Sequence, residues 1–319
     1  MSYAPIRARL EHNQVVVLDG AIGTEILRRD VTWADHQLLS RPDVVRSIHA
    51  DYLAAGADVL STNTFQLTRR GFLQHFKDLE HMRHIGALDL ETRWAELLTA
   101  GVRLAVEARA QASLNAQVAV AGALTTVEWC FRPDLAPDLE QAYAEYLEVS
   151  RVFAAAGCDL LLIETVNSVG EAVAAARAAR AVSLPYWIAF VPDQDGRLFS
   201  GETLAEATAA LAPLRPDAVL VNCAPPEDVA VGLAQLAKSA TTPIGVYPHV
   251  GRFDPPEWLF TEEYPPPRYV ELTRDWLEQG ALIVGGCCGT TPEHIAAMAA
   301  AVSGGAADKS LRLRPSPPL

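Results

Sequence analysis

The sequence lacks a long apolar run, since no stretch reaches the roughly 18–20 apolar residues that a membrane-spanning helix needs. The opening residues MSYAPIRARLEHNQ also lack the apolar core of a signal peptide. Positive charge is scarce: 26 Lys and Arg residues stand against 39 Asp and Glu residues, and the formal net charge is −13. Nucleic acids and anionic membranes attract basic surfaces, so we expect neither as a partner.

Cysteine is also sparse, with five residues in the chain. An odd number in a chain without a signal peptide does not suggest a disulfide framework, so we expect a reducing, cytoplasmic location. Apolar residues, by contrast, make up 50% of the 319 residues, enough for a large buried core. This length suits one α/β barrel, which needs about 250 residues plus insertions.

Short apolar runs rich in β-formers recur along the whole chain. They are continuously apolar rather than alternating, which is typical of strands buried on both faces of a parallel sheet. The eight runs are 14–20, 57–64, 117–124, 158–165, 185–191, 217–224, 242–249 and 280–288.

The segments between these runs have helical periodicity and are rich in Ala, Leu, Glu and Arg, as in 171–182 and 228–239. Eight strand–helix repeats predict an α/β fold with a single (β/α)8 barrel, or TIM barrel. A doubly wound open sheet is the alternative, but no Gly-rich phosphate turn follows the first strand.

We assign residues 1–303 to this barrel and expect a disordered tail over 304–319. The long segment 65–116 predicts an extra helix. The Pro- and aromatic-rich segment 251–270 predicts an irregular loop.

Function in such a barrel gathers where the strands end, at the C-terminal face. Two of these ends carry Cys223 and the pair Cys287-Cys288, and strands six and eight are separated by strand seven alone. Three thiolates suit Zn²⁺ with a fourth position open for a substrate. Either cysteine segment alone would more often be apolar core, so the prediction depends on both together. Cys158 begins the fourth strand at the opposite face and is predicted to be core.

Further polar residues end the other strands and are candidates for substrate binding: Asp19, Thr64, Glu164 and Asn222. A carboxylate at the end of the apolar run before Glu164 is costly unless it is paired. Asp19 has an alternative role, as the N-cap of the helix that begins near Thr24.

Five motifs carry a resemblance to a known family: DGAIGTEI (19–26), STNTF (61–65), IET (163–165), VNC (221–223) and GGCCGTTPEHI (285–295). Together they resemble the homocysteine S-methyltransferase family, over about residues 14–302. The resemblance implies a (β/α)8 barrel with a zinc ion held by Cys223, Cys287 and Cys288. It also implies that Asp19 and Glu164 bind the amino group of the amino-acid thiol.

The chain also departs from that family. Residues 123–138 replace the Gly-Pro-Tyr-Gly loop of the sulfonium-using members, and Thr165 stands where the betaine-type enzymes have Tyr. His249 stands where relatives often have an Asn that occupies the open zinc position. It is a candidate fourth ligand in the resting state, and a histidine hydrogen-bonded to the loop 251–270 is the equal alternative. Trp129 and Trp33 are candidates for a cation–π cage around the methyl donor, and Cys130 for a spare thiol near the mouth.

The leading hypothesis is a zinc-dependent methyltransferase that moves a methyl group from a small onium donor, sulfonium or betaine-like, to homocysteine and gives methionine. Selenocysteine, selenohomocysteine or another thiol is the alternative acceptor. A non-catalytic zinc- or thiol-binding barrel is the alternative from another class. A Schiff-base aldolase is disfavoured because no strand ends in Lys. The sequence names neither the donor nor the oligomeric state.

Overall fold

The computed structural model describes residues 3–29, 37–75, 90–254 and 257–305. Eight parallel strands form one sheet in the order β1-β10-β7-β6-β5-β4-β3-β2, and a bridge between Leu18 and Val59 joins its two edges. The predicted (β/α)8 barrel is therefore confirmed, and each strand lies on one of the eight apolar runs. The strands are β1 (Val16–Val17), β2 (Val59–Ser61), β3 (Ala119–Leu124), β4 (Leu160–Val166), β5 (Tyr186–Phe190), β6 (Ala218–Asn222), β7 (Ile244–Tyr247) and β10 (Ile283–Val284).

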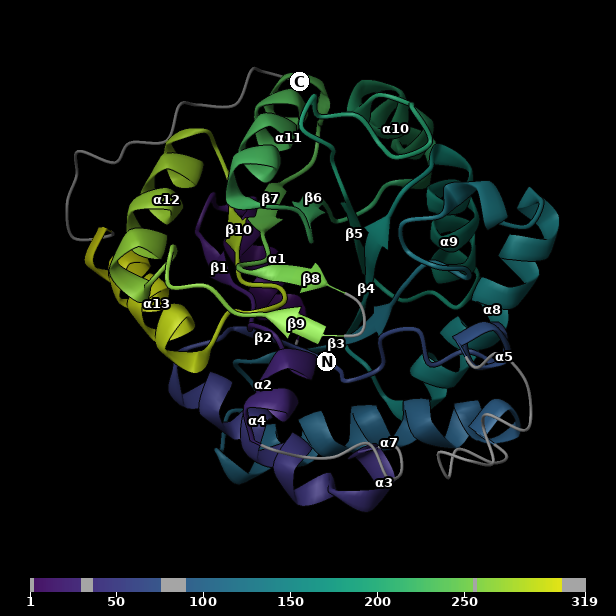
Figure 1. Ribbon diagram of the computed structural model, residues 1–319, viewed down its shortest axis with the longest axis horizontal. Helices are drawn as coiled ribbons and strands as arrows, with labels where there is room; N and C mark the ends of the chain where they lie inside the picture. The colour runs from purple at the N-terminus through teal and green to yellow at the C-terminus, as the bar shows by residue number, and fades with distance from the viewer. Residues whose placement is uncertain (1–2, 30–36, 76–89, 255–256, 306–319) are drawn as a thin grey trace.

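Helices surround this ring of strands (Figure 1). The extra helix predicted between the second and third strands is present, since both α5 and α7 lie there. The outer helices are α2 (Gly23–Arg28), α3 (Gln37–Ser40), α4 (Pro42–Ala54), α5 (Arg69–His75), α7 (Leu90–Gln111), α8 (Leu139–Ala156), α9 (Val169–Ala181), α10 (Leu204–Leu211), α11 (Pro226–Ser239), α12 (Pro266–Glu278) and α13 (Pro292–Gly305).

The buried side chains form two layers because successive residues of a strand face opposite sides. One set fills the barrel interior and includes Val59, Leu160, Leu162 and Tyr247. The other set, which includes Leu60, Leu161 and Ile163, packs between the strands and the helices. Helix α1 (Tyr3–Glu11) closes the N-terminal end of the interior, where the Trp187 indole donates a 2.9 Å hydrogen bond to the Tyr3 hydroxyl. The opposite, C-terminal end is left for the site.

The prediction of an irregular loop over 251–270 is wrong. This segment contains an antiparallel hairpin, β8 (Arg252–Asp254) and β9 (Glu257–Leu259), and the first residues of α12. The hairpin projects onto the centre of the ring of strands in Figure 1. Prolines mislead here because they fit the first positions of a helix, where α12 begins at Pro266. At the other end of the chain, α13 continues to Gly305, and most of the predicted tail lies outside the described residues.

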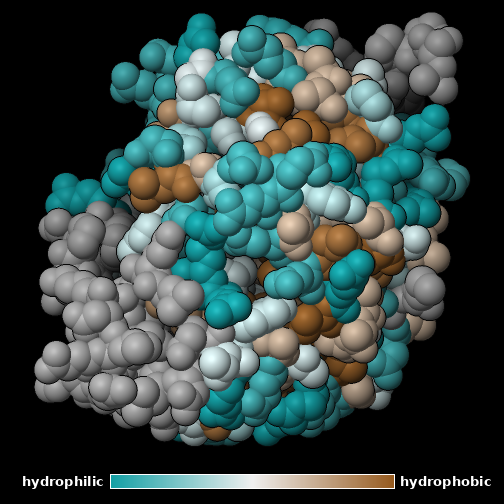
Figure 2. All heavy atoms as spheres, turned by 90° about the vertical axis from the view of Figure 1, so that its right-hand side faces the viewer, coloured by the Kyte–Doolittle hydropathy of each residue, from teal (hydrophilic) through white to brown (hydrophobic). Residues whose placement is uncertain are grey.

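The outer surface mixes polar and apolar residues. The face shown in Figure 2 carries several apolar patches separated by hydrophilic side chains. In the described parts of the chain, no helix is both long enough and apolar enough to cross a membrane.

Because His49 on α4 is buried, we expect the free energy of unfolding to fall at acid pH. Its side chain is fully buried, neither ring nitrogen has a hydrogen-bond partner among the described residues, and burial lowers its pKa from 6.5 to about 4. Between pH 6.5 and pH 4 the unfolded chain therefore binds a proton at His49 that the folded chain does not bind. This contribution to stability is complete above pH 6.5 and is lost as the pH falls towards 4, by about 3 kcal/mol in total.

Urea unfolding between pH 7 and pH 4 measures this effect as a difference between variants. Native protein should lose more unfolding free energy than His49→Leu over this range, by about 3 kcal/mol. His12→Gln, at an exposed histidine, is the matched control and should follow the native protein. Parallel curves for the native protein and His49→Leu would refute the assignment.

Candidate metal and substrate site

The three predicted cysteine ligands come together at the C-terminal end of the barrel. Cys223 directly follows β6, and Cys287 and Cys288 follow β10. Their sulfur atoms all lie within 4.8 Å of one another. A tetrahedral zinc ion with Zn–S bonds near 2.3 Å needs sulfur atoms roughly 4 Å apart, so the cluster has a suitable size.

The end of β7 holds both cysteine segments in place. The Cys223 amide donates to the Tyr247 carbonyl (3.3 Å), and the Cys287 amide donates to the Pro248 carbonyl (2.8 Å). The Cys288 carbonyl accepts from the Val250 amide at 2.8 Å. Gly289 is required after the pair, because its φ is +83° and a Cβ there would lie 1.7 Å from the Val250 carbonyl oxygen. The backbone therefore makes a tight turn around the cysteine pair.

The three thiols share negative charge unequally. Hydrogen bonds from Cys223 and Cys287 hold the pKa of Cys288 well below its usual value. Hydrogen bonds with Cys287 and Cys288 raise the pKa of Cys223 well above its usual value. Three sulfur donors close together form a soft donor set, and such a set favours a soft metal cation.

Two carboxyl groups, Asp19 and Glu164, lie at the same end of the barrel. Asp19 accepts from the Ser61 amide (2.8 Å) and the Ser61 hydroxyl (2.9 Å), and burial raises its pKa well above the usual value. Glu164 accepts from the Tyr247 hydroxyl at 3.3 Å. Burial raises the pKa of Glu164 to about 7, although the Tyr247 hydrogen bond opposes this shift.

Each of these carboxyl groups acts on the other parts of the site. The negative charge of Glu164 contributes to the raised pKa of Asp19, and that of Cys288 contributes to the raised pKa of Glu164. A cation entering this space would lower both pKa values, because it stabilises the ionised carboxylates. The alternative role of Asp19 as a helix cap is wrong, since α2 has no side-chain cap.

The polar groups of Asn222 and Thr64 are used within the protein. Asn222 accepts from the Thr165 amide and donates to the Thr165 hydroxyl, both at 3.2 Å, and Thr165 has a φ of +63°. It thus fixes the end of β4 next to Glu164. The Thr64 hydroxyl donates to the Ala123 carbonyl at 2.9 Å and ties the end of β2 to β3.

His249 lies next to the cysteine cluster. Its amide donates to the Ala224 carbonyl at 3.1 Å, and its ring packs edge-to-face on Trp258 of β9 with 5.6 Å between centroids. Burial lowers the pKa of the ring, and the charge of Cys288 opposes this shift. In the part of the chain that the structure describes, no fourth His, Cys, Asp or Glu joins the three sulfurs within 4.8 Å.

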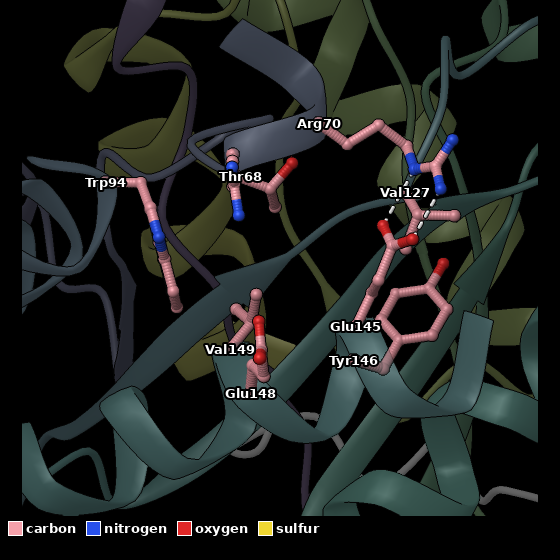
Figure 3. A pocket seen from close by; sticks show the side chains of 9 residues that line it. Thr68, Arg70, Trp94, Val127, Glu145, Tyr146, Glu148 and Val149 are labelled. Carbon is pink, nitrogen blue, oxygen red and sulfur yellow. Dashed lines mark hydrogen bonds and ion pairs between the residues drawn. The ribbon is translucent and has the colours of Figure 1, made fainter. Parts of the chain in front are cut away.

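The segment 123–138, in which the sequence departs from the family, is fixed by residues distant in the chain. Arg70 of α5 donates to Glu128 (2.9 Å) and, through its Nε, to Glu145 of α8 (2.7 Å). The Arg70–Glu145 pair borders a hollow of about 30 Å³ (Figure 3). This space suits a water molecule rather than a substrate, and no predicted site residue lines it.

Two exposed phenylalanine side chains lie next to hydrogen bonds that join the segments after β3 and β5. Asn167 donates to the Cys130 carbonyl and accepts from the Ser200 amide at 3.2 Å, which joins the segments after β3 and β5. Next to these two positions, Phe131 and Phe199 are 45% and 47% exposed and pack edge-to-face, with 5.5 Å between centroids.

The other aromatic and cysteine candidates have separate outcomes. Trp129 is 40% exposed on the same segment as Phe131, whereas Trp33 lies outside the described residues. Cys130 is buried next to Trp129, and burial and the charge of Cys288 raise the pKa of its thiol to about 12. Cys158 belongs to the apolar core, as predicted.

Sequence reasoning missed Ser61 and Tyr247, the two residues that bind the carboxyl groups. Side chains of a strand alternate between the barrel interior and the helices, and this alternation places Ser61 and Tyr247 inside the barrel. The sequence pattern could therefore have identified both residues. Their partners, however, depend on the register between strands.

Comparisons with known proteins show what this chain is similar to. The family model described as homocysteine S-methyltransferase matches residues 16–302. The chain is 29% identical to homocysteine S-methyltransferase YbgG of Bacillus subtilis, over 93% of this chain and 97% of that protein. It is 27% identical to the selenocysteine Se-methyltransferase of Brassica oleracea var. italica, over 88% and 87% of the two chains. The metallated form of the homocysteine methyltransferase MmuM from Escherichia coli is similar in structure, with a TM-score of 0.77, 28% identity and coverage of 93% and 99%.

Proposed function

Because this chain belongs to the homocysteine S-methyltransferase family, we propose that it transfers a methyl group from a small onium donor to the thiol of homocysteine, giving methionine. The observation that carries this proposal is the cluster of three cysteine sulfurs within 4.8 Å of one another, beside two carboxyl groups. The cluster supports thiol activation, and the carboxyl groups support recognition of an amino acid.

Cys223, Cys287 and Cys288 would hold a zinc ion, because three sulfur donors and an open fourth position suit that metal. When bound, zinc would lower the pKa of a thiol that reaches this position, which is near 8.5 in water, and keep the sulfur nucleophilic. Cys223 and the Cys287-Cys288 pair arise from strands separated by β7, so the barrel itself holds the donor set together.

The carboxyl groups of Asp19 and Glu164 would bind the ammonium group of homocysteine. Burial raises the pKa of both carboxyl groups. An ammonium group beside them would lower both pKa values, because it stabilises the ionised carboxylates. Asn222 and Thr64 would act through their neighbours, because their own polar groups hold the ends of β4 and β2 in place. The substrate sulfur is then directed towards the cysteines.

The transfer itself would be an in-line displacement. The deprotonated sulfur attacks the methyl carbon from the side opposite the onium atom, and a carbon–sulfur bond forms. The bond between the methyl carbon and the onium sulfur or nitrogen breaks, its electron pair stays with the donor, and the donor leaves without its positive charge. The thiol proton is released to solvent.

Aromatic side chains at the barrel mouth support a cationic donor. Trp129, Phe131 and Phe199 are exposed on the segments that follow β3 and β5, and the face of an aromatic ring attracts a sulfonium or quaternary ammonium group. A cation–π contact at an exposed site contributes about 0.5–1 kcal/mol. Phe131→Ala and Phe199→Ala should therefore each raise the KM for the donor by roughly two- to fivefold.

Steady-state kinetics with each substrate varied in turn measures this effect. The KM for homocysteine should stay unchanged in both variants. Val231→Ala, at an exposed apolar residue of α11, is the matched control and should leave both KM values unchanged. A rise in the homocysteine KM equal to that of the donor would count against a donor site at these rings.

His249 is proposed to complete the metal site while no thiol is bound, since it follows β7, between the strands that carry the cysteines, and the charge of Cys288 acts on its ring. Cobalt-substituted protein reports this ligand through its visible absorption bands. His249→Asn should change these bands in the resting protein and leave them unchanged once homocysteine is bound, because the thiol displaces the ring. Identical resting spectra for the native protein and His249→Asn would argue against the proposal.

A selenium acceptor is the second candidate, because a selenocysteine Se-methyltransferase is among the similar proteins. Turnover tests with S-methylmethionine and betaine as donors, and with homocysteine or selenocysteine as acceptor, separate the candidates. Methionine formation at the higher kcat/KM supports the leading proposal. Faster methylation of selenocysteine favours the second candidate, and binding without any methyl transfer indicates a non-catalytic barrel.

A further inference from the structure

Asn167 contacts both of the segments that carry the exposed phenylalanine side chains. It directly follows β4 and is fully buried. Its side-chain nitrogen donates a hydrogen bond to the Cys130 carbonyl, one residue before Phe131. Its own carbonyl accepts from the Ser200 amide at 3.2 Å, one residue after Phe199. One residue therefore holds the backbone beside each of the two rings.

The first turn of α9 adds one contact to each of these segments. The Glu171 carboxylate accepts from the Val127 amide at 3.2 Å, which fixes the segment after β3. The Glu202 carboxylate accepts from the Val169 amide at 2.7 Å, which fixes the segment after β5. Both ring-bearing segments are thus attached to the start of one helix, directly after β4.

The two rings contact each other at an angle that leaves ring faces available. Phe131 and Phe199 pack edge-to-face, with 5.5 Å between centroids and 80° between planes. In such a pair, the ring that presents its edge keeps both of its faces free of its partner, and the face of an aromatic ring attracts a cation. A shift of either segment would change this angle and this separation, because each ring is attached one residue from its anchor.

Strand β4 connects the two rings to the proposed acceptor site. Glu164 lies on this strand, three residues before Asn167. An in-line displacement needs the methyl carbon and the attacking sulfur to be aligned, and holding two reactants in one geometry lowers the barrier. The residues that hold the rings and the residue proposed to bind the ammonium group of homocysteine therefore belong to one continuous segment.

We propose that Asn167 and the first turn of α9 position the methyl donor, because they hold Phe131 and Phe199 where the rings bind its onium group. Asn167 is then a positioning residue, which acts through the rings rather than by contact with the donor. This inference rests on the proposed function, since it assumes that an onium donor binds at these rings.

Asn167→Ala removes the hydrogen bond to the Cys130 carbonyl and tests the proposal. Steady-state kinetics uses whichever of S-methylmethionine and betaine the native protein accepts as donor. The donor KM should rise by roughly two- to fivefold, as it does on loss of a ring, and the KM for homocysteine should stay unchanged. Glu202→Ala releases the segment after β5 from α9 at a half-buried position, and it should show the same split between the two KM values.

A background that lacks both rings separates positioning from a general loosening of the fold. In the Phe131→Ala/Phe199→Ala protein, Asn167→Ala should cause no further rise in the donor KM, because effects that act through the same group do not add. Asn115→Ala is the matched control, at an exposed residue before β3, and should change neither KM. Thermal melting confirms that each variant is folded.

The outcomes distinguish the inference from the function on which it rests. An unchanged donor KM in either folded variant, Asn167→Ala or Glu202→Ala, would overturn the role of this segment while the proposed function stands. A further rise in the donor KM in the background without rings would do the same. Native protein that methylates homocysteine with neither donor would overturn the proposed function and the inference with it.

Discussion

Replacing Cys288 by serine is expected to remove most of the bound zinc and to lower methyl transfer by at least about a thousandfold, because structural and catalytic zinc sites depend on each of their few ligands. Hydrogen bonds from Cys223 and Cys287 hold the pKa of Cys288 well below its usual value. A serine hydroxyl stays protonated and is a harder donor, so the remaining two sulfurs would hold the ion weakly. Zinc is measured by elemental analysis after dialysis, and activity by the methionine formed.

The matched control for this variant is Cys158→Ala, a cysteine of the apolar core at the start of the fourth strand run. It should keep both zinc and activity. Cys288→Ser should also keep the circular dichroism of the native barrel, because the strands do not depend on the mouth for their packing. A Cys288→Ser variant that retains zinc at the native level would contradict the assignment of the metal site.

Glu164→Gln is expected to weaken the binding of homocysteine by roughly ten- to a hundredfold, because a hydrogen bond to a charged group contributes about 1.5–3 kcal/mol. Glutamine keeps the size of the side chain and removes its negative charge. The thiol 4-sulfanylbutanoate has no ammonium group, so Glu164→Gln should bind it as tightly as native protein does, or more tightly. Calorimetric titration with both ligands gives the comparison.

Glu148→Gln, on the exposed side of α8, is the control for a general change in net charge and should bind both ligands as native protein does. Equal losses for the two thiols in Glu164→Gln would mean that Glu164 supports the site without touching the ammonium group. The contact with Tyr247 would then be its main role.

The barrel could be predicted from the sequence because its strands are buried on both faces. Runs such as 158–165 and 217–224 are continuously apolar, and this pattern is hard to explain in another way. The hairpin β8–β9 could not be predicted from the Pro-rich segment around it. Its strands have three residues each, too short for a clear alternation, and within the described part of the chain they pair with each other alone.

Part of the site could be predicted because cysteines and acidic residues at strand ends are unusual. The grouping of Cys223, Cys287 and Cys288 was predicted in this way. The partners of these residues depend on register, which the sequence does not contain: Asp19 reaches Ser61 across 42 residues and Glu164 reaches Tyr247 across 83. For the same reason the sequence suggested that Asn222 faces the substrate, whereas its amide binds the backbone and hydroxyl of Thr165.

The measurement that tests the central claim most directly is X-ray absorption at the zinc edge, with and without homocysteine. The claim is that the substrate thiol binds the metal held by Cys223, Cys287 and Cys288. In the resting protein we expect three sulfur ligands near 2.3 Å and one lighter ligand. Addition of homocysteine should give four sulfur ligands at about the same distance. An unchanged spectrum under saturating homocysteine, or a resting site with fewer than three sulfur ligands, would contradict the account.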